Sequence, residues 1–74
     1  MSVVRKRSVT IGGHRTSYSI EDPFHEELVR VAAERGMPVA ALIAEIDAAR
    51  PPQTNLSSAI RLHVLERLKG RRIC

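Results

Sequence analysis

Polar and apolar side chains alternate along residues 15–20, and this is the clearest strand pattern in the chain. Because successive side chains of a strand point to opposite faces, one face is small and polar with a single long cation, and the other is β-branched or aromatic. The polar face carries Arg15, Ser17 and Ser19, and the opposite face carries Thr16, Tyr18 and Ile20. A lone strand leaves its backbone N–H and C=O groups without partners. Since most of the remaining chain predicts helix, we expect this strand to pair with the same strand of a second copy.

A second, shorter alternation of polar and apolar residues precedes this strand. Residues 8–11 alternate like a strand, and Gly12-Gly13 is a turn signal. A hairpin between 8–11 and 16–20 is therefore an alternative, but four residues make a weak strand and an isolated hairpin is marginal. We interpret residues 1–14 as a flexible basic N-terminal arm with a short accessory strand.

Two helices are expected after the strand. The first covers about residues 23–35, because Asp22 is a capping residue, Pro23 suits the first helical turn, and Gly36 ends an apolar stripe of helical spacing. The second covers about residues 39–49 and is apolar almost all the way round. Such a helix must be buried on nearly every side, which in so short a chain predicts a second subunit.

A third helix is expected over residues 56–69, between a cap at Asn55 and a stop at Gly70. With its Pro-containing connector and basic tail it forms segment 51–74, which follows a strand-helix-helix core over residues 15–50. The predicted fold class is mostly α: an intertwined homodimer that shares a two-stranded ribbon, with a third helix added. The apolar residues expected to fill the dimer core are Tyr18, Ile20, Phe24, Leu28, Val31, Val39, Leu42, Ile43 and Ile46.

Composition argues against several classes of function. The chain has 74 residues and a single cysteine, Cys74, so no disulfide can form within it. The three histidines have no metal-ligand spacing, no Ser-His-Asp, Cys-His or Gly-rich phosphate motif is present, and the sequence implies no enzyme, metal or cofactor. No apolar run reaches the roughly 20 residues that span a bilayer. We therefore expect a cytoplasmic protein with no membrane partner, in which a partner subunit supplies the stability that a small fold needs.

The charge is positive and unevenly distributed. The net charge is +4 and the pI is about 10.2. Residues 1–15 contain no acid and residues 51–74 contain only Glu66, whereas acids outnumber bases in the first predicted helix. Basic ends around an acidic helix favour an anionic partner at particular surfaces, although solubilising charge accounts for the same numbers.

The order of strand, helix, glycine turn and apolar helix resembles the ribbon-helix-helix family of bacterial DNA-binding proteins, of the Arc and MetJ type. The matching residues begin with Arg15-Thr16-Ser17-Tyr18-Ser19-Ile20 and Glu21-Asp22-Pro23-Phe24, and continue through Leu28, Val31, Ala32, Gly36, Val39, Leu42, Ile43 and Ile46. Several further segments also resemble a short bacterial subfamily with a third helix appended.

The resemblance implies an obligate homodimer whose antiparallel ribbon lies in the major groove of double-stranded DNA. Carried over by position, Arg15, Ser17 and Ser19 would read base edges, and arginine can bond guanine in a bidentate way. Family members commonly grip phosphate at the start of the second helix with a polar cap, but Pro38 stands there in this chain. The expected phosphate contacts are therefore the backbone amides of Val39 and Ala40 together with the basic residues Arg5, Lys6 and Arg7.

Two functions follow as expectations. The first is a sequence-specific DNA-binding homodimer that acts as a transcriptional repressor. The alternative is an antitoxin-like interaction module, which dimerises through the ribbon-helix-helix core and binds a partner protein through residues 51–74. The sequence leaves open which of the two applies and whether residues 8–11 form a second strand.

Overall fold

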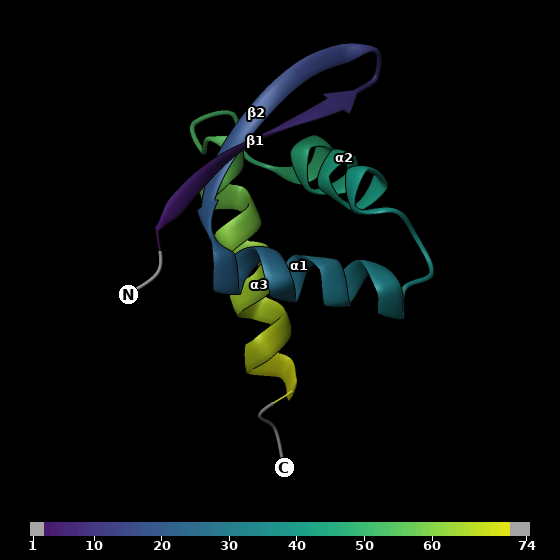
Figure 1. The fold of residues 1–74 in the computed structure, drawn as a ribbon, viewed down its shortest axis with the longest axis vertical. Coiled ribbons are helices and arrows are strands. Elements are labelled where there is room, and N and C mark those ends of the chain that lie inside the picture. Colours follow the sequence, from purple (N-terminus) through teal and green to yellow (C-terminus); the bar gives the residue numbers. More distant parts are fainter. Residues whose placement is uncertain (1–2, 72–74) are drawn as a thin grey trace.

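The computed structural model describes residues 3–71, the last of them by its backbone alone, and begins with a β-hairpin. Strand β1 (Val4–Ile11) pairs antiparallel with β2 (His14–Glu21) (Figure 1). The turn between them consists of Gly12 and Gly13, with φ of 56° and 84°. A two-residue turn of this kind needs positive φ at both central positions, which glycine adopts without steric cost. The glycine pair therefore sets the register of the whole hairpin.

The hairpin, which the sequence predicted only as an alternative, is present, and its first strand is longer than residues 8–11. β1 starts at Val4, so residues 5–7 belong to a paired strand and not to a flexible arm. In this single chain β1 occupies the position beside β2 that we had assigned to a second copy. The homodimer itself stays a prediction.

Three helices follow the hairpin, within two residues of the predicted bounds. They are α1 (Asp22–Glu34), α2 (Val39–Ala49) and α3 (Leu56–Arg71). Asn55 caps α3 as expected, because its side-chain oxygen accepts a hydrogen bond from the Ser58 N–H at 2.9 Å. The predicted cap of α1 is wrong: Glu21 occupies the N-cap position and makes no side-chain cap bond, and Asp22 is already helical.

Gly36 ends α1 as predicted. Its φ of 67° is left-handed, and the N–H groups of Gly36 and Met37 donate to the carbonyl oxygens of Ala33 and Ala32 at 3.1 and 3.0 Å. These two bonds form a Schellman motif. The sharp reversal brings α2 back beneath the ribbon (Figure 1).

One hydrophobic core lies between the hairpin and the helices, and α3 is part of it. Most of the predicted core residues are buried in this one chain, whereas Phe24 and Val39 are partly buried and pack against the buried set. The buried set is Val9, Tyr18, Ile20, Leu28, Val31, Ala32, Leu42, Ile43, Ile46, Leu56, Ala59, Ile60 and Val64. The helix α3 is therefore part of the same packed unit, because it packs against α1, α2 and β2.

The apolar circumference of α2 does not require a second subunit. Its large side chains, Leu42, Ile43 and Ile46, are all buried against α3, α1 and β1. The apolar residues that remain exposed on this helix are alanines, among them Ala40 and Ala48. An alanine exposes little apolar surface, so the composition of α2 alone does not predict a second subunit.

If α3 belongs to the cooperative core, truncating its buried side should destabilise the protein. Ile60 is fully buried, whereas Leu62 is 56% exposed on the same helix. Ile60→Ala should lower the free energy of unfolding by about 2–5 kcal/mol because it leaves a cavity. Leu62→Ala, the matched control, should change it by less than about 0.5 kcal/mol. Urea denaturation measures both, and equal midpoints for the two variants would contradict the assignment.

Two half-buried histidines make stability depend on pH. Burial lowers the pKa of His25 and of His63, and nearby cations, Arg7 and Arg67 respectively, lower it further. The unfolded chain therefore takes up protons near pH 6.5, where the folded chain does not yet bind them. The free energy of unfolding should be highest above that pH and fall as the pH drops below it. Urea titrations at about pH 7.5 and 5.5 check this; His25→Gln and His63→Gln should each show a smaller difference between the two pH values.

Candidate functional site

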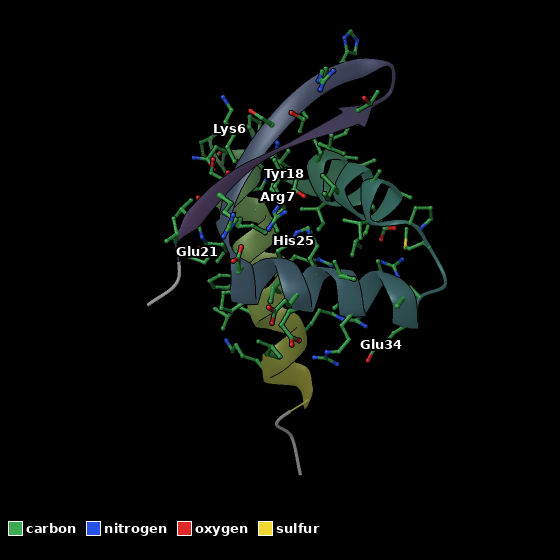
Figure 2. The ribbon with its side chains drawn as sticks, in the orientation of Figure 1. Lys6, Arg7, Tyr18, Glu21, His25 and Glu34 are labelled. Carbon is green, nitrogen blue, oxygen red and sulfur yellow. The ribbon has the colours of Figure 1, made fainter. Side chains whose placement is uncertain are left out.

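The outer face of the ribbon is polar and exposed. Directly opposite residues of an antiparallel pair place their side chains on the same face. Val9, Tyr18 and Ile20 point into the core, so their neighbours point outward. The outward pairs are Thr10 with Arg15, Ser8 with Ser17, Lys6 with Ser19, and Val4 with Glu21. Figure 2 shows Lys6 on the side away from the helices, with Tyr18, Arg7 and His25 between the ribbon and α1.

The three predicted base-reading residues lie together on this outer face. Arg15 and Ser17 are exposed and Ser19 is partly buried. Tyr18 faces inward as expected, and burial raises the pKa of its phenol. The strand prediction from residues 15–20 is thus confirmed for both faces of β2.

Side chains of α3 form hydrogen bonds with the backbone of Ser19, on the edge of β2 that faces away from β1. The Ser19 N–H donates to Ser57 Oγ at 2.8 Å, and the Arg61 guanidinium donates to the Ser19 carbonyl oxygen at 3.1 Å. Both backbone groups of Ser19 therefore point away from β1. Because antiparallel pairs alternate between hydrogen-bonded and non-hydrogen-bonded, those of Arg15 and Ser17 point the same way.

Arg61 also forms an ion pair with Glu21 at the end of β2, with 3.1 Å between Nε and Oε1. A hydrogen bond from its own backbone and one from Arg61 lower the pKa of the Glu21 carboxyl. The Glu21 carboxylate on the outer face is thereby paired with the Arg61 guanidinium of α3. The contacts of Arg61 fix the junction between ribbon and helix.

The predicted phosphate contacts divide into two groups. Arg5 and Arg7 each lie close to the Asp22 carboxylate, at 3.1 and 3.2 Å. These ion pairs are partly exposed, so each contributes little and an added anion can compete for the guanidinium groups. Lys6 points outward from the same strand, and no ion pair joins it to another of residues 3–70.

The start of α2 offers backbone amides and no side-chain cap. Pro38 is the N-cap, and its carbonyl oxygen accepts hydrogen bonds from the N–H groups of Ala41 and Leu42 at 3.1 and 3.2 Å. The first-turn amides of Val39 and Ala40 precede these two. Their role in gripping an anion stays a prediction.

Sequence reasoning missed the β1 side of the outer face. Ser8 and Thr10 were not singled out, and Lys6 was assigned to a flexible arm. The signal was the Gly12-Gly13 pair: a two-residue turn forces Thr10 opposite Arg15 and places every second residue of β1 on the same face. Within residues 3–71, no group of three or more metal-binding side chains occurs and no helix has the length and apolarity of a membrane span.

Comparison with known proteins agrees with this geometry. A family model described as a ribbon-helix-helix domain matches residues 4–68, from the first residue of β1 into the last turns of α3. Searches of curated proteins and of solved structures found no match. Ribbon-helix-helix domains typically bind DNA as dimers. The match covers both strands and all three helices, and the chain belongs to the ribbon-helix-helix family.

Proposed function

We propose that this protein is a sequence-specific DNA-binding protein of the cytoplasm that acts as a transcriptional repressor in the form of a homodimer. The observation that carries the proposal is the outer face of the ribbon, where Arg15 projects from a row of small polar residues. The major groove is about 12 Å wide and admits a two-stranded ribbon. The strands of such a ribbon lie about 4.8 Å apart.

The chemistry of the outer face suits base recognition. Arg15 can donate two hydrogen bonds to O6 and N7 of guanine, the commonest specific contact in the groove. Ser17 and Ser19 can each donate or accept, so their preference among bases is weak. Ser19 is partly buried and its backbone is held by α3, so it reaches less far than Arg15.

Positioning would come from phosphate contacts. Lys6 lies on the outer face and can bind a phosphate directly. Arg5 and Arg7 can release the Asp22 carboxylate and bind a phosphate in its place, since both ion pairs are partly exposed. The amides of Val39 and Ala40 add the positive end of a helix dipole. Each phosphate contact of this kind steepens the dependence of log affinity on log salt by close to one unit.

Replacing Arg15 should separate specific from general binding. Arg15→Ala should cost about 1–3 kcal/mol on the selected site and relax one base position. Arg67→Ala removes the same charge from the distal half of α3 and should leave every base preference in place. Selection of bound sequences from a random DNA pool gives the preferences, and mobility-shift titration gives the affinities. A wild-type protein that binds genomic and random DNA equally well at physiological salt would overturn the proposal.

The homodimer makes a direct prediction. We expect sedimentation equilibrium to show a dimer at micromolar concentration and a complex of two chains on the selected DNA. A protein that stays a monomer both free and on DNA would contradict this part of the proposal.

An antitoxin-like interaction module remains the second candidate, and one surface favours it. Leu62 and Leu65 on α3 are 56% and 46% exposed, and Leu62 borders a shallow apolar depression with Ile46 and Ala49. A double variant, Leu62→Ser with Leu65→Ser, should then lose a stoichiometric partner that the wild type and Arg15→Ala both retain on purification from the host. Purification of the wild type without such a partner would count against this function.

A further inference from the structure

We propose that Ser57 and Arg61 of α3 are positioning residues for the proposed DNA-binding surface. They fix the direction in which the ribbon projects from the helices, without contacting DNA themselves. The inference rests on the proposed function and adds to it, because α3 lies outside the strand-helix-helix core that the family resemblance covers. It gives the third helix a part in sequence recognition.

The contacts between α3 and the ribbon converge on the end of β2. The Ser19 N–H donates to Ser57 Oγ at 2.8 Å, and the Arg61 guanidinium donates to the Ser19 carbonyl oxygen at 3.1 Å. The same guanidinium donates through Nε to Glu21 Oε1, also at 3.1 Å. A planar guanidinium that bonds two acceptors restricts both their distance and their orientation. This end of the strand is therefore fixed relative to α3.

The helix that makes these contacts is itself firmly held. Ser57 and Arg61 are four positions apart, so they lie on one face of α3. Large side chains beside that face are buried in the core: Leu56, Ile60 and Val64. The Ser58 N–H donates to the Asn55 side chain at 2.9 Å and thereby caps the first turn. Since the turn is capped and its neighbours are packed, Ser57 Oγ and the guanidinium of Arg61 have little freedom to move.

The proposed base-reading residue Arg15 lies well beyond this fixed point. It is four positions from Ser19, which is about 13 Å along a strand. Figure 1 shows the ribbon running from the start of α1, past α3, to a turn that projects beyond the helices. A tilt of about 10° at Ser19 would move Arg15 by about 2 Å, whereas a recognition site tolerates about 0.5 Å. The bonds at Ser19 therefore determine where Arg15 meets the groove.

The contacts of α3 also differ from those that hold β1. Arg5 and Arg7 pair with Asp22, and phosphate can compete for both guanidinium groups. The bond between Ser57 and the Ser19 N–H joins two uncharged groups, so phosphate does not compete for it in this way. When phosphate binding releases β1 from α1, the bonds to α3 keep the ribbon in place.

Salt dependence separates positioning from a direct phosphate contact by Arg61. Arg61→Ala should keep the wild-type slope of log affinity against log salt, because one lost phosphate contact would reduce that slope by close to one unit. It should weaken base preferences about tenfold, the value of one hydrogen bond to a charged group. Arg67→Ala removes the same charge from α3 and should change no preference. A slope reduced by a full unit with base preferences intact would overturn the inference.

An uncharged substitution tests the same contact without changing the charge. Ser57→Ala removes the acceptor of the Ser19 N–H and should weaken base preferences about fivefold in selection from a random DNA pool. Ser58→Ala, the same change at the next residue, should not. Hydrogen exchange at the Ser19 amide should become about fivefold faster in Ser57→Ala and stay unchanged in Ser58→Ala. Wild-type exchange at Ser19 in both variants would contradict the assigned role.

The remaining outcomes separate positioning from a general loss of structure and from failure of the proposed function. Circular dichroism and urea denaturation establish that each variant is folded under the binding conditions. A folded variant that binds every sequence more weakly by one common factor would overturn the inference. If the wild type selects a sequence and both Ser57→Ala and Arg61→Ala keep its preferences, the inference is wrong and the proposed function stands. If the wild type selects no sequence, the proposed function has failed and the inference falls with it.

Discussion

The pairing of β1 with β2 is the interaction on which the rest of this structure depends. It begins at two glycines with positive φ and continues over eight residues on each side. It satisfies one edge of β2, closes one side of the core with Val9 and Tyr18, and determines which side chains face outward. Without it, the polar residues of β2 would lie on a single strand with no fixed orientation.

A second constraint comes from far along the chain. Ser57 and Arg61 of α3 bind the backbone of Ser19, and Arg61 also pairs with Glu21. These bonds connect residues about 40 positions apart in sequence. The third helix thus supports the ribbon directly, and the family match extends through most of α3. At the ribbon base, Asp22 pairs with both Arg5 and Arg7, and Glu21 pairs with Arg61. Lys6 and Arg15 are cations of the outer face.

The helices and the faces of β2 could be predicted from sequence because each depends on local signals. Capping at Asn55, the left-handed Gly36 and the alternation of residues 15–20 all act within a few positions. β1 could not be predicted at full length, because Arg5, Lys6 and Arg7 show no alternation of polarity. Their strand is stabilised by pairing with β2 and by Asp22, and neither contact is visible in a local window.

The interpretation of α2 failed for a different reason. Its composition predicts burial on all sides, but pattern alone does not weigh side-chain size. The large side chains of α2 are buried against α3 and the ribbon: Leu42, Ile43 and Ile46. The alanines on its exposed side present little apolar surface to water.

The open edge of β1 has a further consequence. The backbone groups of Lys6, Ser8 and Thr10 point away from β2, by the same alternation that directs Ser19 toward α3. An additional strand could bond there, yet a sheet three strands wide would span about 10 Å between the axes of its outer strands, and the outer backbones add further width on each side. A groove of about 12 Å has no room for that. If the ribbon inserts into DNA as proposed, strand addition at this edge would exclude that insertion, and bound nucleic acid would protect the edge against aggregation.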